Sequence, residues 1–277
     1  MRDEPNLWAD LGGVAIALAL FAAVVFVPPD TSLAEVRRDG VLRACVPPSY
    51  GTLVTGDPAA PGFEVEVLQI VADRLGVRLT LNVNPAIGRD FNPRAWRLTR
   101  AQCQVIAGGV VATTTTRSFL DTTPPHLETG WVLVTADALP STLEGMTIGV
   151  HSGVSGRDRL ALSRALREAR AEIELVDTPA ALERGLRDGE YAAVVTDSLE
   201  GGALAARGGW EIAWLLGPEG HDPVAFGLWK GDLTLKRRIV SILADLEADG
   251  TMQELAARYG IVPINRSLGD EAGEPAA

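Results

Sequence analysis

The sequence is poor in the residues that build metal and nucleic-acid sites. Its three histidines (His126, His151 and His221) stand far apart and no HExxH motif occurs, so the sequence gives no sign of a zinc site. Only Lys230 and Lys236 among the 25 basic residues are lysines, and the formal net charge is −11. Without a basic stripe, neither a nucleic-acid partner nor an anionic membrane surface is expected.

Common enzyme motifs are also missing. No GxxxxGK[ST] motif occurs, and the stretch HSGVSG at 151–156 does not have the spacing of GxSxG. We interpret that stretch as a glycine-rich turn between a strand and a helix. No catalytic residue, metal or cofactor is therefore predicted. With 277 residues, 47% of them hydrophobic and 22% charged, the chain is globular and forms one large or two ordinary domains.

One segment departs from this soluble pattern. Residues 11–27 are apolar and carry no charge, and their length lies between a signal-peptide core and the roughly 20 residues that span a bilayer. The acidic residues ahead of the segment favour an uncleaved anchor, whereas Ser32 and Ala34 form a small-x-small pattern that favours cleavage before Glu35. Both readings remain open. Either one places the rest of the chain outside the cytoplasm, with membrane contact only through residues 11–27.

The two cysteines, Cys45 and Cys103, lie far apart and form no CxxC motif. In an oxidising compartment, such a pair indicates one structural disulfide. Two separately buried thiols are the alternative.

Short apolar runs alternate with amphipathic stretches along the chain, which predicts an open, largely parallel α/β sheet. The first set comprises strands at 41–46, 78–84 and 104–111 and a helix at 62–77. The pattern then restarts, which predicts a second lobe, with strands at 146–153, 172–177 and 191–198 and helices at 157–169 and 180–189. A strand at 222–232 and two helices within 235–261, separated at Gly250, complete the pattern.

Six motifs follow one another between residues 36 and 263, and they include GVLRACVPPSYGTL, GFEVEVLQIVADRLGV, LEGMTIGVHSGVSG and GEYAAVVTDS. Together they resemble solute-binding protein family 3, the amino-acid-binding proteins of ABC importers. The resemblance implies the type II periplasmic-binding fold, in which two α/β lobes, each an open mixed sheet flanked by helices, are joined by two crossing strands. It divides the chain into a signal or anchor (1–34), lobe 1 (35–130), lobe 2 (131–221), a return to lobe 1 with C-terminal helices (222–265) and a disordered tail (266–277).

The resemblance also implies ligand contacts around the run TTTTR. Arg117, with Thr114 three places before it, matches the arginine that grips the ligand carboxylate. A planar guanidinium suits this task because it donates two parallel hydrogen bonds. Main-chain donors at Gly109 and Thr113, and Ser155 from the other lobe, complete the predicted carboxylate site. The alternative for Arg117 is a solvated arginine after a Thr-rich turn.

Other positions correspond to the rest of an amino-acid ligand. Asp197 in VVTDS matches the aspartate that pairs with the ligand ammonium, although it could simply cap the next helix. Tyr50 and Phe91 match the two aromatic residues that enclose the ligand side chain, although both could belong to the core.

The resemblance has departures that bear on the ligand. Thr115 replaces a usual proline, and the glycines lie one residue further from Arg117 than usual. Pro47 stands where relatives that bind basic amino acids have an acid, which disfavours a lysine- or arginine-like ligand. The spacing around Cys45 and Cys103 resembles a branch associated with quinoprotein dehydrogenases.

We therefore predict a monomeric, non-enzymatic binding protein that closes on a small amino acid or carboxylate and delivers it to an ABC permease. The alternatives are a cyclohexadienyl-dehydratase-like enzyme on the same fold, and a membrane-anchored sensory or accessory protein.

Overall fold

The computed structural model describes residues 12–16, 18, 29–87, 93–152, 159–261 and 263–268. The chain divides into two compact units, Met1–Thr31 and Ser32–Ala277. In the first unit, residues 12–16 and 18 are helical. Within the described ranges, no helix is both long and apolar enough for a membrane span. Most of the apolar segment 11–27 lies outside these ranges, so the choice between anchor and cleaved signal stays a prediction.

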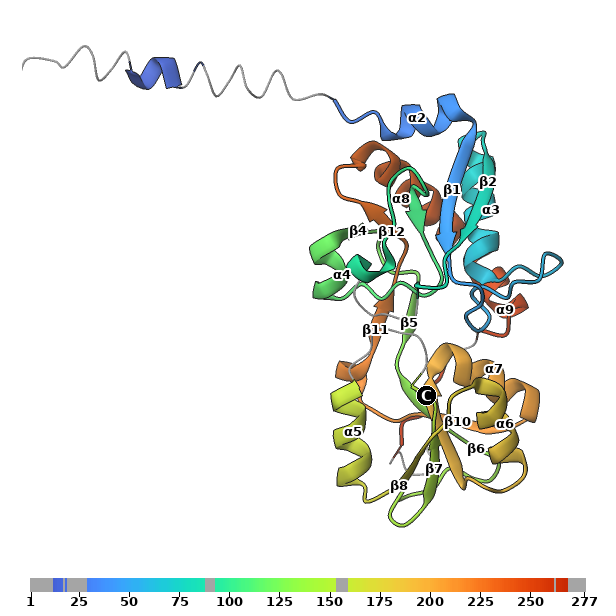
Figure 1. Ribbon diagram of the computed structural model, residues 1–277. Helices are drawn as coiled ribbons and strands as arrows, with labels where there is room; N and C mark the ends of the chain where they lie inside the picture. The colour runs from blue at the N-terminus through green and yellow to red at the C-terminus, as the bar shows by residue number, and fades with distance from the viewer. Residues whose placement is uncertain are drawn as a thin grey trace, which may run out of the picture. The chain divides into compact units, whose positions relative to one another are not determined.

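The second unit contains two five-stranded sheets flanked by helices (Figure 1). The first sheet has the order β2-β1-β3-β12-β4. Its strands are β1 (Val41–Val46), β2 (Arg78–Val83), β3 (Val105–Ile106), β4 (Leu120–Thr122) and β12 (Gly227–Trp229). Strand β1 pairs in parallel with β2 and β3, whereas β12 runs antiparallel to β3 and β4. The first sheet is thus completed by a strand from late in the sequence.

The second sheet has the order β10-β6-β9-β7-β8. Its strands are β6 (Trp131–Thr135), β7 (Thr147–Val150), β8 (Glu172–Leu175), β9 (Ala193–Asp197) and β10 (Glu211–Trp214). Strands β8, β7 and β9 are parallel, and β6 is antiparallel to both β9 and β10. We call the first sheet and its helices lobe 1, and the second sheet and its helices lobe 2. This arrangement confirms the predicted two-lobed α/β fold.

Two short antiparallel strands lie side by side between the sheets (Figure 1). They are β5 (Leu127–Thr129) and β11 (Asp222–Val224), and Leu127 pairs with Val224. The single strand predicted at 222–232 is therefore wrong, because it is broken into β11 and β12. At the break, the backbone N–H of Ala225 donates to the Val110 carbonyl and that of Phe226 to the Thr123 hydroxyl.

Five helices of the second unit lie in stretches that the sequence predicts to be helical, and three others lie outside those stretches. The helices are α2 (Ser32–Asp39), α3 (Phe63–Leu75), α4 (Thr114–Phe119), α5 (Arg159–Glu168), α6 (Pro179–Arg187), α7 (Ser198–Gly208), α8 (Leu233–Ala248) and α9 (Thr251–Arg258), with short 3₁₀ turns at Pro93–Trp96 and Pro218–Gly220. The predicted separation of the last two helices is confirmed: Gly250 has φ 81°, a left-handed conformation that suits glycine and ends the run of helical backbone.

The two cysteines are bonded to each other in the structure. Cys45 lies on β1, Cys103 lies just before β3, and the two positions are 58 residues apart. Both are fully buried in a small apolar cluster with Ile87, Trp96 and Ile106. The bond fastens two neighbouring strands of lobe 1.

Strand β3 is much shorter than the predicted 104–111. It ends at Ile106 because Gly108 (φ 96°) and Gly109 (φ 77°) turn the backbone into the left-handed region, which an extended strand does not use. The residues after β3 consequently form an irregular turn that leads into α4, at the carboxyl end of the parallel strands.

Candidate functional site

The loop that follows β1 in lobe 1 packs against the loop that follows β3 and approaches the start of α7 in lobe 2. The buried Tyr50 ring packs against Gly109, where an added Cβ would lie 2.3 Å from Tyr50 Cε1, so only glycine fits. A Cβ on Gly51 would lie 3.4 Å from the Leu199 carbonyl oxygen. Predicted contacts from both lobes therefore gather at the carboxyl ends of strands, where ligands of open α/β sheets bind.

Asp197 is the lobe-2 residue of this region. It ends β9, is fully buried and caps α7: its Oδ1 accepts hydrogen bonds from the N–H groups of Leu199 (3.0 Å) and Glu200 (3.2 Å). The helix-capping role considered from the sequence is thus present in the structure. Capping also fixes the carboxylate in place at the edge of the sheet, which is what a pre-organised ammonium partner requires.

Glu64 is a buried carboxylate whose position the sequence did not reveal. Its Oε2 accepts the N–H groups of Gly108 and Gly109 (2.5 and 3.1 Å), and its Oε1 lies 2.8 Å from His126 Nε2. The Gly109 N–H is therefore already engaged by a carboxylate of the protein itself, which argues against the predicted use of this donor for a ligand. An acid in the first turn of a helix usually stays in solvent, so only its place beside Phe63 hinted at burial.

His151 and Glu200 form a second pair that the sequence did not single out. His151 follows β7, and its Nδ1 lies 2.7 Å from Glu200 Oε2, which also accepts the Thr196 hydroxyl at 2.9 Å. Burial by itself lowers the pKa of His151. Three neighbours outweigh this effect and raise the pKa above its usual value of 6.5. They are Glu200, through a hydrogen bond and its charge, Asp197, through its charge, and the Asp177 backbone, through a hydrogen bond.

The raised pKa of His151 makes the stability of the fold depend on pH. A group whose pKa is higher in the folded state stabilises that state fully below its unfolded pKa, and the contribution is lost as the pH rises through the folded pKa. We therefore expect Glu200→Gln to flatten the fall in unfolding free energy between about pH 6 and 8. Denaturant titrations across this range measure it, with Glu144→Gln in an exposed ion pair as the control. An unchanged slope in Glu200→Gln would contradict the assignment.

The threonine run forms the start of α4, a helix that the sequence analysis did not predict. Thr113 caps the helix: its hydroxyl accepts the Thr116 N–H at 3.1 Å. Thr116 is buried and its hydroxyl lies 3.2 Å from that of Thr113, whereas Thr114 and Arg117 are exposed. Thr116 is therefore the residue of the run that takes the inward position.

Arg117 instead borders a separate groove of about 850 Å³ beside β4, together with Lys230, Lys236 and Arg237. Within this groove, Lys236 pairs with Asp121 at 2.7 Å. The role of Arg117 as a carboxylate clamp stays a prediction, and its exposed position argues against it. Two further predicted contacts, Phe91 and Ser155, lie outside the described residues.

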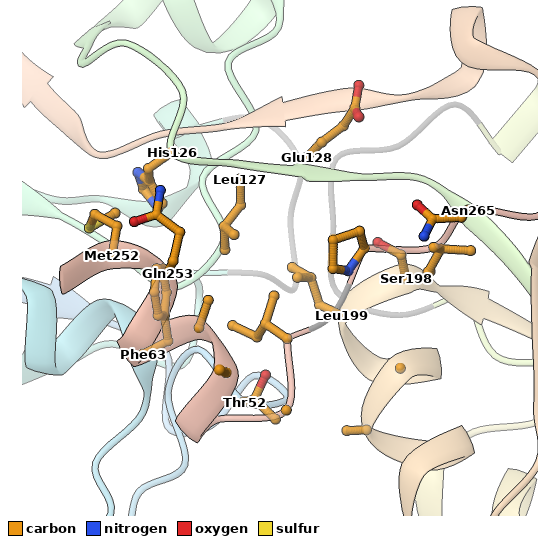
Figure 2. Close-up of a pocket in the computed structure, with 18 of the residues that line it drawn as sticks. Thr52, Phe63, His126, Leu127, Glu128, Ser198, Leu199, Met252, Gln253 and Asn265 are labelled. Atoms are coloured by element: carbon orange, nitrogen blue, oxygen red, sulfur yellow. The ribbon is translucent and has the colours of Figure 1, made fainter. Parts of the chain in front are cut away.

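Another groove, of about 710 Å³, lies where the two lobes meet (Figure 2). We call it the hinge groove. Its walls include Phe63 of lobe 1, Leu127 of β5, Leu199 of α7 and Met252 of α9. Among the described residues, no cluster of three or more acidic, histidine or cysteine side chains is arranged to hold a metal ion.

A comparison with protein families identifies the family of this chain. The model of the bacterial extracellular solute-binding proteins, family 3, matches residues 42–261. The chain belongs to this family. The match confirms the resemblance inferred from the sequence and covers both lobes of this solute-binding protein. A comparison with curated proteins finds no match.

Solved structures share the fold at low sequence identity. An ancestral cationic amino acid solute binding protein has a TM-score of 0.65 and 19% identity, covering 82% of this chain and 99% of its own. A mutant of ArgBP from T. maritima has a TM-score of 0.60 and 22% identity, and the match covers 82% of this chain and 98% of the other. A substrate binding protein of an ABC uptake transporter from Streptococcus pneumoniae, with bound histidine, has a TM-score of 0.62 and 18% identity. The match covers 83% of this chain and 96% of the other. At such identities the likeness establishes the fold alone.

Proposed function

We propose that this solute-binding protein captures a small amino acid or related carboxylate between its lobes, outside the cytoplasm, and delivers it to an ABC importer. Asp197 carries the proposal. Its carboxylate is fully buried, oriented by two main-chain N–H groups, and located where Tyr50 and Gly51 of lobe 1 approach lobe 2. A buried carboxylate that is fixed in this way suits a ligand ammonium.

Closure of the lobes would follow from where the contacts lie. The ammonium group would meet Asp197 on lobe 2, while the rest of the ligand would meet Tyr50 and the start of α4 on lobe 1. A ligand that satisfies both sides only in the closed form stabilises that form by its differential affinity. Strands β5 and β11 are the proposed hinge, because the chain crosses between the sheets through them.

The carboxylate of the ligand is assigned to the first turn of α4. Thr113 and Thr116 place two hydroxyl groups there, and Thr114 remains a proposed contact through its main chain. This arrangement uses neutral donors, so it holds a carboxylate less tightly than a bidentate guanidinium would.

Arg117→Ala tests the carboxylate assignment. We expect the substitution to change ligand affinity by less than about threefold, because an exposed charge outside the site contributes little. Isothermal titration of the full-length protein with its best amino-acid ligand measures the effect, and Arg237→Ala in the same exposed groove serves as the matched control. A loss of tenfold or more in Arg117→Ala alone would establish Arg117 as the clamp after all.

A screen by calorimetry against the amino acids and small dicarboxylates tests the function itself. The absence of any ligand among them would overturn the proposal. An enzymatic function is the second candidate, because one structure of the same fold is described as a precursor of cyclohexadienyl dehydratase. Release of carbon dioxide from prephenate or arogenate in the presence of the protein would favour this candidate over simple binding.

A further inference from the structure

The hinge groove has apolar walls supplied by both lobes. Figure 2 shows Leu127 of β5 directed toward α7 and α9, whereas Glu128 points to the other side of the strand. The apolar lining of the groove comes from lobe 1, lobe 2 and the segment after α9. It comprises Phe63, Leu127, Leu199, Trp214, Met252 and Ile261. The described residues around the groove include no lysine or arginine, and the acids among them are Glu128 and Glu247. Such walls favour an apolar molecule and disfavour an anion.

His126 is a buried polar side chain bordering this groove. It is 4% exposed, and its ring stacks on Phe226 with the centroids 4.5 Å apart. Nε2 lies 2.8 Å from Oε1 of Glu64, a carboxylate that already accepts two main-chain N–H groups through Oε2. Glu64 is therefore the acceptor, and Nε2 carries the hydrogen.

The second nitrogen of this ring has no such bond. Nδ1 of His126 is buried and has no hydrogen-bond partner among the described residues. With the hydrogen on Nε2, a neutral ring offers Nδ1 as an acceptor. A buried acceptor without a donor is costly and therefore rare in native proteins. An O–H group of a ligand that donates a hydrogen bond to Nδ1 would remove this cost.

We propose that the hinge groove is a second binding site, separate from the Asp197 site, for an uncharged apolar alcohol or phenol. The apolar body of the ligand would pack among Phe63, Leu199 and Trp214. Its hydroxyl would donate to His126 Nδ1 after a small displacement of the ring that opens this buried atom to the groove. The volume of about 710 Å³ accommodates a molecule with one or two rings. Because the described lining residues include no cation, the groove would not favour carboxylates or phosphates.

The site would influence ligand capture at Asp197. Because the walls come from both lobes, the groove changes shape when the lobe angle changes, and its occupant favours one angle. His126 also contacts Glu64, which holds the Gly108–Gly109 turn beneath Tyr50. Binding at the two sites is then linked, and each ligand changes the affinity of the other by the same factor.

Three probes of equal core size test the site on the full-length protein: benzyl alcohol, benzyl methyl ether and benzoate. We expect benzyl alcohol to bind at least about tenfold more tightly than the ether, which cannot donate, and benzoate not to bind. Chemical-shift changes in NMR spectra give the affinities and show which lobe residues respond. Equal affinity for the alcohol and the ether, preference for benzoate, or no binding would each overturn the proposal.

Two substitutions locate the binding. His126→Gln retains an amide donor for Glu64 but replaces the Nδ1 acceptor with an amide oxygen at a different position, so it should reduce the preference for the alcohol over the ether. Ala257→Trp fills the groove from an exposed position on α9 and should abolish binding of the alcohol. Ala206→Trp, on an exposed face of α7 outside the groove, is the control that leaves binding intact.

Benzyl alcohol binding that persists in Ala257→Trp would place the molecule elsewhere and reject the site. Circular dichroism of each variant establishes that it is folded, and Ala257→Trp provides the test if His126→Gln is not. Amino-acid binding at Asp197 is measured separately, so failure of the hinge groove and failure of the proposed function give different results.

Discussion

Asp197→Asn is expected to weaken amino-acid binding by about 100-fold, equivalent to about 3 kcal/mol. The substitution removes the negative charge that pairs with the ligand ammonium and leaves the amide in the same buried place. Asparagine is as good a helix cap as aspartate, so the hydrogen bonds to Leu199 and Glu200 persist and the fold is preserved. Isothermal titration with the best ligand measures the loss.

Thermal unfolding of Asp197→Asn without ligand provides the control, because a capping role alone would affect stability and not affinity. Glu200→Gln, one turn along α7, tests whether any carboxylate nearby has the same effect. Unchanged affinity in Asp197→Asn would remove the central residue of the proposed site. A large drop in melting temperature without ligand, by contrast, would show that Asp197 acts mainly as a structural cap.

Replacement of both Cys45 and Cys103 by alanine is expected to lower the free energy of unfolding by about 4 kcal/mol. Their bond links residues 58 positions apart and restricts the unfolded chain, and closing a loop of this size contributes about that much in the chain-entropy account. Domains are typically stable by about 5–15 kcal/mol, so the double variant should be close to unfolding. Urea titration of the variant and the wild-type protein measures the difference.

Reducing agent gives an independent control for this prediction. It should destabilise the wild-type protein toward the variant and leave the variant itself unchanged. A difference of less than about 1 kcal/mol between the two proteins would show that the bond contributes little beyond the packing of its apolar cluster.

Local patterns predicted part of the regular elements, including the main helices of lobe 1. The helix at Phe63–Leu75 and the break at Gly250 follow from apolar spacing and from glycine, which act over a few residues. Strand β3 was predicted too long because the apolar run continues through Gly108 and Gly109, and only their left-handed backbone ends it. The spacing of apolar residues gives no sign of such a change in backbone conformation.

The candidate site was less predictable than the fold. In a run of four threonines, each residue can cap the helix, so the sequence does not determine that Thr113 does so and that Arg117 consequently faces solvent. The partners Glu64 and His126 are 62 positions apart and meet only through the tertiary fold. Asp197 is the exception, because the end of a buried strand and the start of a helix mark its place in the sequence itself.

The position of β12 has a consequence for the order in which the chain folds. Lobe 2 takes its five strands from the continuous stretch 131–214, whereas the lobe-1 sheet needs Gly227–Trp229 between β3 and β4. A chain that emerges from its N-terminus can therefore complete the second lobe first. Both cysteines emerge much earlier, so their oxidation can hold β1 beside β3 until the missing strand arrives.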